Sequence, residues 1–450
     1  MIITYLKYEF IIYTLELLFK IIYTKKYDLH LKKAVLGRIT MHYHDKNVLI
    51  TGISGFAGSY LAKELISQGA SVHGLVRRRA DGAIPKNIVD QRIIEELNLI
   101  EGDLTDITSL ACAMDQAEPD YIFHLAAQSF VERSFNNSME TQNINCMGTA
   151  NLLETVRIKD INPKIVFAGS SEEYGLVISS TEQYEKVMQD YGTIFPEPSE
   201  TVEVPIKETN PLRPMSPYAV SKVYGDYLMR NYYHSYGLDT VVSRAFNHEG
   251  AGRGSMFVTS VITNQIMKLK YGEKDHIEIG NLNALRDWSH VKDIIQGYLL
   301  LAKKGNSGDV YNQGSMRTNS VLSYILLGLE EAGWKINQIQ TLQKDKKIEN
   351  PTETDQTPIY GIKFPKTKVD QLIMEGQLEY TIKDKGIQVE TPNGNITIKF
   401  NPDRFRPAEV PLLLSDTRKI QKIGAKIKYS LNDILKDQLN YYLKKENRNS

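Results

Sequence analysis

Residues 47–58 read NVLITGISGFAG, and this stretch decides the fold. A short run rich in β-branched residues leads directly into three spaced glycines, Gly52, Gly55 and Gly58, and apolar residues with helical spacing follow over 59–67. Glycines at such a strand-to-helix turn let the backbone approach a pyrophosphate, which binds at the N-terminus of the helix. The stretch therefore predicts the start of a dinucleotide-binding domain.

Short apolar strands and helical stretches continue to alternate along the chain. This alternation is typical of a parallel sheet with helices on both faces. The sequence predicts an α/β fold, with a doubly wound parallel (Rossmann) sheet and a smaller C-terminal α+β substrate domain. The expected strands are 47–51, 70–76, 97–100, 121–125, 165–168, 240–244 and 310–312, and the expected helices include 59–67, 104–117 and 141–157.

Composition shifts along the chain predict its domain boundaries. We expect an N-terminal extension outside the fold at 1–43 (with Met41 as an alternative start), a mainly dinucleotide-binding domain at 44–245, a mainly substrate-binding domain at 246–440, and a tail at 441–450 that is frayed from Lys444. The strand near 310–312 is expected to return to the first sheet. The polar, proline-containing stretch 176–212 is predicted to be a long surface connection. The stretch 340–403, with Asn393-Gly394 between alternating segments, is predicted to be an insertion bearing a hairpin.

The composition is that of an ordinary globular protein. Lys+Arg and Asp+Glu are both 54, so the formal net charge is zero, and the hydrophobic share is 42%. Balanced charge argues against bulk electrostatic binding of nucleic acid. Only two cysteines, Cys112 and Cys146, are present, which excludes a disulfide framework and fits a reducing, cytoplasmic compartment. The histidines show no ligand spacing, so no metal is expected.

The first 23 residues are rich in Ile, Leu, Phe and Tyr but carry the charged residues Lys7, Glu9, Glu16 and Lys20. A membrane span needs about 20 mostly uncharged residues, so no integral membrane span is expected. An amphipathic helix lying on a membrane surface is the alternative for this segment.

The second expected strand ends in Arg77-Arg78-Arg79, without an acidic residue. In dinucleotide-binding folds an acid at this place binds the ribose 2′-hydroxyl, whereas arginine accommodates a 2′-phosphate. Arg77 and Arg78 therefore favour NADP over NAD as the cofactor. Asp103 follows the third strand, where it can reach the adenine amino group or serve as an ordinary helix N-cap.

The chemical centre is the pair Tyr218 and Lys222, spaced i and i+4 on one face of a helix. A cation beside a phenol lowers the pKa of the phenol, so Tyr218 is predicted to be the acid/base of an alcohol–ketone interconversion. Ser170 and Glu172 follow the strand 165–168. Ser170 can hydrogen-bond the reacting oxygen, and Glu172 lies at the mouth of the sheet, where open α/β folds bind ligands. A surface Tyr–Lys pair without a chemical role is the alternative.

Several segments resemble known families. TGISGFAG (51–58), HLAAQ (124–128) and YAVSK (218–222) resemble the extended short-chain dehydrogenase/reductases. A more specific set is similar to the GDP-mannose 4,6-dehydratase family, namely AAQSFVERSF (126–135), SPYAVSK (216–222), FNHEGAGRGSMFVT (246–259), IGNLNALRDWSHVKD (279–293) and RFRPAEVPLLLSD (404–416). The likeness covers about residues 45–440, apart from the two long stretches at 176–212 and 340–403.

The resemblance implies a reaction and the residues that perform it. Tyr218 would take the O4 proton while hydride leaves C4 of the sugar for NADP, and Glu172 would remove the C5 proton before water leaves C6. Ser170 and Lys222 complete the implied catalytic set. The implied cofactor contacts are Gly52, Gly55, Phe56, Ala57, Gly58, Arg77, Arg78, Asp103, Leu104, Ala126, Gln128, Tyr218 and Lys222. The implied contacts with a nucleotide-sugar substrate, GDP-mannose in the first place, are Asn247, Arg286, Arg406 and Glu409.

Two alternatives to this function stay open. The segments SSEEYG (170–175) and LRPMSPY (212–218) are more similar to GDP-4-keto-6-deoxymannose reductase than to the dehydratases, which usually show Thr-Ser-Glu. A reductase, or another nucleotide-sugar epimerase or dehydratase, is therefore the close alternative. A non-catalytic NADP-binding regulatory protein is the second, although a binding module has no need of the Tyr218–Lys222 pair.

The resemblance also implies an assembly. The family commonly pairs through helices that include the one bearing Tyr218, so a homodimer or homotetramer is expected. The residues Tyr224, Tyr227, Leu228 and Asn231 give this helix an amphipathic face for such a contact, or for packing on the core of the protein itself.

Overall fold

The computed structural model describes residues 42–342, 346–406 and 409–449. The expectations for the first 41 residues, including the alternative start at Met41 and the membrane-surface helix, lie outside the described residues. The extension was expected to include residue 43, and this boundary is wrong. Tyr43 is 2% exposed, and its hydroxyl donates to the Leu299 carbonyl at 2.7 Å. Tyr43 is therefore part of the core.

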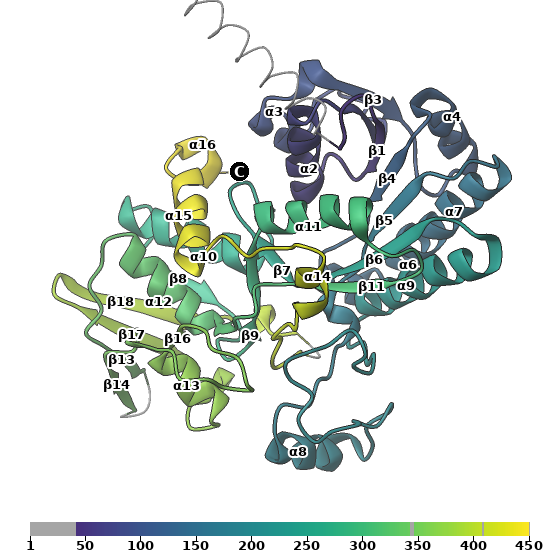
Figure 1. Cartoon of the computed structure of the whole chain (residues 1–450). Coiled ribbons are helices and arrows are strands. Elements are labelled where there is room, and N and C mark those ends of the chain that lie inside the picture. The colour runs from purple at the N-terminus through teal and green to yellow at the C-terminus, as the bar shows by residue number, and fades with distance from the viewer. Residues whose placement is uncertain (1–41, 343–345, 407–408, 450) are drawn as a thin grey trace, which may run out of the picture.

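A seven-stranded parallel sheet forms the first part of the molecule (Figure 1). Its strands lie in the spatial order β11 (Val310–Gln313), β6 (Thr240–Ala245), β5 (Lys164–Ala168), β4 (Tyr121–His124), β1 (Asn47–Thr51), β2 (Ser71–Val76) and β3 (Leu97–Glu101). The order reverses between β1 and β4, because the chain moves outward from β1 first in one direction and then in the other. Ligands of open α/β sheets bind at such a switch point, at the carboxyl ends of the strands.

Both faces of this sheet are covered by helices, as the doubly wound prediction requires. Val48 and Ile50 of β1 pack on one face and Leu49 on the other, and all three are fully buried. The helices on the first face are α2 (Phe56–Ser67), α3 (Lys86–Gln91), α11 (Val291–Lys304) and α14 (Arg418–Lys422). The helices on the second face are α4 (Ile107–Ala117), α7 (Gly148–Ile158) and α9 (Pro217–Tyr236). Strands covered on both faces read as continuous apolar runs, which is why the sequence pattern was clear.

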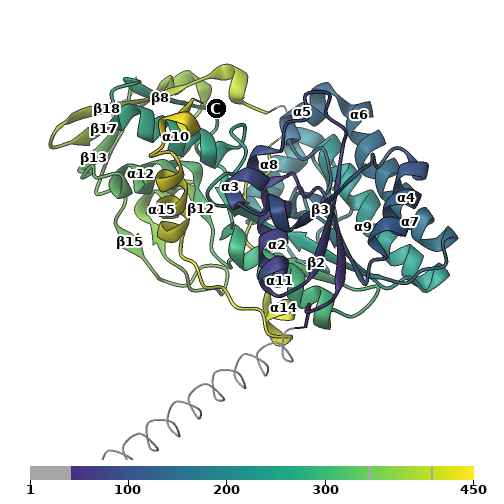
Figure 2. The ribbon, with the colours of Figure 1, turned by 90° about the horizontal axis from the view of Figure 1, so that it is seen from above.

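A second, mixed sheet lies beside the first (Figure 2). Its order is β14 (Lys347–Glu349), β13 (Gln338–Thr341), β17 (Gly386–Thr391), β18 (Gly394–Phe400) and β8 (His276–Ile279). It shares an apolar core with α10 (Val258–Lys270), α12 (Val321–Glu331), α13 (Lys368–Met374) and α15 (Leu431–Tyr441). The hairpin predicted at Asn393-Gly394 is confirmed, since Thr391 pairs with Gly394 across the turn. The stretch 340–403 therefore builds this sheet.

Short elements connect the two sheets and complete the chain. The paired short strands are β7 (Asn247–Glu249) with β10 (Trp288–His290), β9 (Leu285–Arg286) with β12 (Asn319–Ser320), and β15 (Thr354–Asp355) with β16 (Lys366–Thr367). The remaining helices and turns are η1 (Ile94–Glu96), α5 (Val131–Asn136), α6 (Ser138–Gln142), the π-helical η2 (Asn143–Met147), η3 (Ser171–Glu173), α8 (Thr181–Tyr191), η4 (Ile382–Asp384), η5 (Pro402–Arg404) and α16 (Lys445–Arg448). Within the described ranges no helix is long and apolar enough to cross a membrane.

Two segments are more ordered than the sequence suggested. The stretch 176–212 contains α8 on an arm that projects from the sheet (Figure 1), and Ile178, Val187 and Ile194 form a small core of its own. The expected frayed tail is instead the helix α16. Arg448 is 5% exposed and pairs with Glu273 at 3.0 Å. The arm is thus stabilised by its own small core, and the tail by a contact with a residue distant in the sequence.

Candidate active site

The glycine-rich turn lies between β1 and α2, at the switch point of the sheet. Gly52 has φ +80°, and a Cβ at this residue would lie 2.7 Å from the backbone nitrogen of Ala126. A Cβ on Gly58 would lie 2.2 Å from the carbonyl oxygen of Gly52. Gly55, the N-cap of α2, supplies no side-chain cap, so the first-turn amides, including that of Ala57, have no side-chain acceptor there. A glycine turn before helix amides that lack a side-chain cap is a site for a phosphate.

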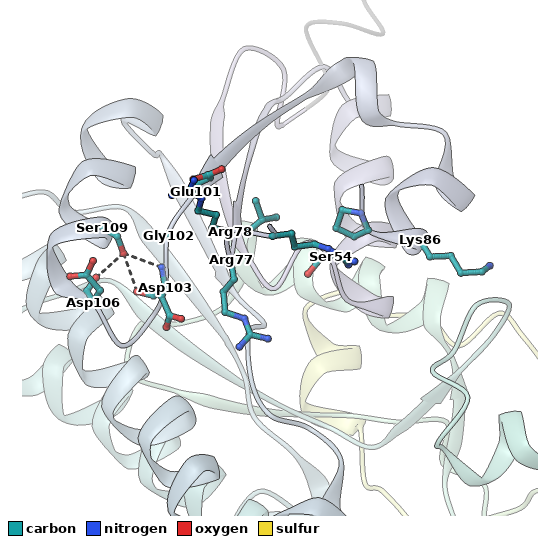
Figure 3. A pocket seen from close by; sticks show the side chains of 12 residues that line it. Ser54, Arg77, Arg78, Lys86, Glu101, Gly102, Asp103, Asp106 and Ser109 are labelled. Atoms are coloured by element: carbon teal, nitrogen blue, oxygen red, sulfur yellow. Dashed lines mark hydrogen bonds between the residues drawn. The ribbon is translucent and has the colours of Figure 1, made fainter. Parts of the chain in front are cut away.

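A cavity of about 800 Å³ beside this turn is lined by Arg77, Arg78 and Asp103 (Figure 3). Arg79 pairs with Asp81 at 2.8 Å. Arg77 and Arg78 have neither a hydrogen bond nor an ion pair with any residue that the structure describes. Two guanidinium groups without partners on a cavity wall suit a phosphate group.

The structure assigns packing or turn contacts to two further residues of the implied cofactor set. The Asp103 carboxylate accepts hydrogen bonds from the amide and the hydroxyl of Thr105 at 2.9 and 2.8 Å. Asp103 is not the N-cap of α4, because Asp106 occupies that position. The Leu104 side chain is 6% exposed and packs in the core on the second face of the sheet. Asp103 thus faces the cavity, whereas the side chain of Leu104 does not line it.

The polar atoms of the Gln128 side chain are bonded to neighbouring residues. Its amide group donates to the Phe130 carbonyl at 3.1 Å and to the Thr141 hydroxyl at 3.2 Å. Its side-chain oxygen accepts the Phe130 amide at 2.6 Å. These three bonds hold the loop after β4 in shape. The backbone of Gln128 is bonded as well, because its amide donates to the Asn145 side-chain oxygen at 2.8 Å and its carbonyl accepts from the Asn145 side-chain nitrogen at 3.1 Å.

Tyr218 and Lys222 lie on the first turns of α9, on the face that packs against the sheet. Ser216 caps the helix by accepting the Ala219 amide at 3.1 Å, which fixes where α9 begins. Tyr218 is 8% exposed and Lys222 4% exposed. The Lys222 amine donates to the Ala168 carbonyl at the end of β5, at 2.7 Å. The alternative of a surface Tyr–Lys pair is therefore wrong.

Ser170 and Glu172 belong to the turn η3, which follows β5 and faces the start of α9. The Ser170 hydroxyl accepts the Glu172 amide at 3.2 Å, and it lowers the pKa of the neighbouring Tyr218. Glu172 is half-buried, and its charge acts on Tyr218. The structure brings these residues beside Tyr218 and Lys222, and their chemical roles stay predictions.

One electrostatic expectation is wrong. Burial raises the pKa of Tyr218 above its ordinary range; the hydrogen bond of Ser170 opposes this effect and the charge of Glu172 adds to it. Burial also lowers the pKa of Lys222 to about 8, against the attraction of Glu173. The Lys222 amine is 5.9 Å from the centre of the Tyr218 ring. Desolvation thus sets the direction of the shift, which is opposite to the direction expected from the lysine.

Arg253 is a site residue that the sequence reasoning missed. Its guanidinium lies 3.5 Å from the centre of the Phe257 ring and 5.4 Å from that of Phe56, the first residue of α2. Its Nε is buried, has no hydrogen-bond partner among the described residues, and lies 3.5 Å from the Glu249 carboxylate. His248 stacks on the Phe56 ring, and burial lowers its pKa to about 4, so it is neutral. The only signal in the sequence was the position of both residues in the segment 246–259.

Three of the four residues expected to contact the substrate, Arg286, Arg406 and Glu409, meet in the structure. Arg286 on β9 donates to the Glu409 carboxylate at 2.5 Å and to the Val410 carbonyl at 2.6 Å. Arg406 lies 3.6 Å from the same carboxylate. Asn247 on β7 is half-buried, and its Oδ1 has no hydrogen-bond partner. Chain segments more than a hundred residues apart thus supply one charged corner of the site.

These features define a class of protein. An open α/β sheet presents a phosphate-binding glycine turn, a cavity with two unpartnered arginines, and a buried Tyr–Lys–Ser group at the carboxyl ends of its strands. The donor set fits a dinucleotide, because Cβ atoms on Gly52 and Gly58 would meet backbone atoms, and Arg77 and Arg78 have no bonded partner among the described residues. The class is that of dinucleotide-dependent enzymes acting on alcohols and ketones.

The chain belongs to the NAD dependent epimerase/dehydratase family, whose sequence model matches residues 48–314. It is 33% identical over 389 residues to the GDP-mannose 4,6-dehydratase of Yersinia enterocolitica, covering 84% of this chain and 89% of that protein. It is 30% identical over 403 residues to GDP-mannose 4,6 dehydratase 2 of Caenorhabditis elegans, covering 88% of each chain. The resemblance expected from the sequence is confirmed.

A solved structure agrees with the fold. The RMD protein of Pseudomonas aeruginosa, complexed with NADPH, superposes with a TM-score of 0.60 at 22% sequence identity. The match covers 88% of this chain and 98% of that one. The similarity confirms the Rossmann architecture with its smaller second domain.

Proposed function

We propose that this protein is a nucleotide-sugar dehydratase that converts GDP-mannose to GDP-4-keto-6-deoxymannose, with NADP as its recycled cofactor. The observation that carries the proposal is the group formed by Glu172, Ser170 and Tyr218. It places a carboxylate base beside the tyrosine that acts as acid/base in the redox step. The likeness to GDP-mannose 4,6-dehydratases over most of the chain supports the choice of reaction and substrate.

The cofactor would be held by the glycine turn, by the amides at the start of α2 and by Arg77 and Arg78 at its 2′-phosphate. NADP, when bound, accepts a hydride from C4 of the sugar and returns it at C6, and its cationic oxidised ring favours the phenolate of a neighbouring tyrosine. Arg253 and Lys222 add buried positive charge around the same place. Arg286, Arg406 and Glu409 would hold the diphosphate and ribose of the substrate.

The chain's own residues divide the proton transfers between them. Tyr218 takes the proton from the O4 hydroxyl, and Ser170 holds the reacting oxygen by a hydrogen bond. The C4 ketone makes the C5 proton acidic, and Glu172 removes it as general base. Glu172 is half-buried and so reaches the open side of the site, whereas Glu173, its neighbour, is fully buried.

The test is to incubate the protein with GDP-mannose and catalytic NADP and to identify the product by mass and NMR. Glu172→Gln should keep binding and reversible reduction of the cofactor but lose C5 proton exchange and the loss of water, by about 10²–10⁴-fold. Tyr218→Phe should show no transient absorbance of reduced cofactor. Formation of the 4-keto-6-deoxy product by Glu172→Gln at the wild-type rate would refute the role of Glu172.

A reductase of GDP-4-keto-6-deoxymannose is the second candidate. The segments 170–175 and 212–218 favour it, because they are more similar to that enzyme. A reductase needs Tyr218 to protonate the C4 oxygen but has no C5 proton to remove. Reduction of the 4-keto sugar by NADPH, with no product from GDP-mannose, would establish it.

We further propose a homodimer or homotetramer working in the cytoplasm. Tyr224 and Tyr227 are 40% and 56% exposed on α9, which supports a contact through this helix. Leu228, by contrast, packs on the core of its own chain, so it is not part of that face. Both cysteines are unpaired, which fits a reducing compartment. A monomer by light scattering at micromolar concentration would refute the assembly.

A further inference from the structure

A cluster of buried charges lies beneath the catalytic turn and has no role in the steps above. Arg244 on β6 has a side chain only 3% exposed, and the side chains of Glu173 and Asp226 beside it are fully buried. Removing charged groups from water is expensive unless each is paired. A cluster of this kind next to a reaction centre therefore calls for a physical explanation.

Arg244 contacts the turn that carries Ser170 and Glu172. Its Nε lies 3.2 Å from the Glu173 carboxylate, and its NH1 donates to the Tyr174 hydroxyl at 3.1 Å. The other oxygen of Glu173 accepts the backbone amide of Ser170 at 2.7 Å. The position of Ser170 is thus linked through Glu173 to the guanidinium by an ion pair, because the Glu173 oxygen that faces Arg244 has no hydrogen-bond donor among the described residues.

Arg244 also contacts the helix that carries Tyr218 and Lys222. Its Nε donates to the Asp226 carboxylate at 2.9 Å. Asp226 stands four residues after Lys222 on α9, so both project from the same side of the helix. One guanidinium on the sheet therefore joins the two elements that supply all four of the proposed catalytic groups.

We propose that Arg244 is a positioning residue, which holds the turn of Ser170 and Glu172 against the helix of Tyr218 and Lys222 through Glu173 and Asp226. This inference rests on the proposed roles of those four residues. A planar guanidinium suits the task, because it makes several directed contacts in fixed geometry. Apolar side chains of similar volume would often fill such a place at equal stability but would not fix these directions.

The cluster also acts on the charge of Lys222. Glu173 opposes the lowering of the Lys222 pKa by burial, with a smaller effect of Cys146, while the ring of His124 lies near the same amine. Burial and Asp226 raise the pKa of Glu173, and Arg244 lowers it. The pKa of Glu173 is about 8 with Arg244 present, so loss of Arg244 would keep Glu173 protonated to higher pH, which would lower the pKa of Lys222 further.

The groups that face Tyr218 affect its pKa, and this pKa determines the second limb of the pH profile. They are Glu172, Glu173, Arg253 and Tyr298. Neutralising Glu173 removes a charge that raises the pKa of Tyr218. Both limbs of the profile should therefore move to lower pH when Arg244 is lost. A contribution to folding alone would not move them.

The experiment compares Arg244→Met and Arg244→Lys with Glu203→Gln as a matched control. Glu203 is also a buried carboxylate paired with an arginine, Arg213 at 2.7 Å, but it lies on the arm of α8. Arg244→Met should lower kcat by about 10²-fold, the cost of misplacing reacting groups by about 1 Å, at unchanged KM and NADP affinity. Arg244→Lys should recover part of kcat. Glu203→Gln should lower the melting temperature but leave both limbs of the pH profile in place.

Hydrogen exchange supplies a measurement that does not depend on the reaction. Peptides covering 169–175 should exchange faster in Arg244→Met than in Glu203→Gln, because the Ser170 amide loses its fixed acceptor. If Arg244→Met does not fold, Glu173→Gln keeps the shape of the side chain and should give the same shift of the alkaline limb. Arg244→Met with wild-type kcat, pH profile and exchange would overturn the proposal. A wild type that makes no product from GDP-mannose would instead refute the proposed function, while the exchange experiment would still test Arg244.

Discussion

Replacing Lys222 by methionine should stabilise the fold while abolishing activity. Lys222 is 4% exposed, and burial lowers its pKa from the ordinary 10.5 to about 8. One pKa unit corresponds to about 1.4 kcal/mol. Keeping this amine charged inside the protein therefore costs the folded state about 3 kcal/mol at neutral pH. Methionine has an unbranched, adaptable side chain of similar length and carries no charge.

Two contacts reduce the expected gain. The amine donates to the Ala168 carbonyl at 2.7 Å, and leaving this carbonyl without a donor costs about 1 kcal/mol. Glu173 also loses a cationic neighbour. The expected net stabilisation at pH 7 is about 2 kcal/mol, which in a chain of this size raises the melting temperature by about 2–4 °C.

The pH dependence identifies the cause. Below pH 8 both the folded and the unfolded chain hold the lysine proton, so the wild type carries the full cost. Between pH 8 and 10.5 only the unfolded chain holds it, so the stability that Lys222 contributes rises with pH and the cost disappears. Melting curves of wild type and Lys222→Met between pH 7 and 10 should therefore differ most at pH 7 and converge above pH 8.

Lys164→Met is the matched control, because Lys164 lies on β5, the strand that the Lys222 amine contacts, and is well paired. Its amine lies 2.5 Å from the Asp239 carboxylate and donates to the Gly305 carbonyl at 3.0 Å. This variant should be less stable than wild type throughout the range. The reasoning fails if Lys222→Met melts below wild type at pH 7, or if the difference between them does not depend on pH.

Three further substitutions test the binding regions. Gly58→Ala should abolish NADP binding and lower the melting temperature, because its Cβ would lie 2.2 Å from the Gly52 carbonyl oxygen; titration of NADP by fluorescence checks this, and wild-type affinity would contradict it. Arg78→Ala should weaken NADP more than NAD, by about 10-fold for a lost charged hydrogen bond, and equal losses for both cofactors would show that it does not contact the 2′-phosphate. Glu409→Gln should lower affinity for the nucleotide sugar without changing that for NADP, because it loosens Arg286; calorimetry with GDP-mannose and with NADP separates the two.

Short-range patterns were enough to predict the first sheet and its chemistry. The β1 strand, the glycine turn and α2 depend on neighbours within a few residues, and so does the i, i+4 spacing of Tyr218 and Lys222. Strand and helix periods are properties of the local chain, so a sequence displays them directly. The hairpin at Asn393-Gly394 could be predicted for the same reason.

The sequence could place Arg286 and Glu409 in one site only through its likeness to a family. Nothing in their spacing indicates a contact, since 123 residues separate them and the contact depends on how β9 meets the segment after η5. The helix α16 in the C-terminal tail could not be predicted from the sequence either, because it is stabilised by the ion pair of Arg448 with the distant residue Glu273.

At the reaction centre, the tertiary structure alone determined which groups are buried. The pattern Tyr-x-x-x-Lys predicts a lowered phenol pKa, yet Tyr218 lies where β5, η3 and α9 exclude water, and desolvation reverses the direction. Arg253 and Arg244 read as ordinary charged residues in the sequence, and their roles follow from being enclosed by Phe56, Phe257, Glu173 and Asp226. A charge changes in energy with every group that surrounds it, and those groups come together only when distant segments of the chain pack.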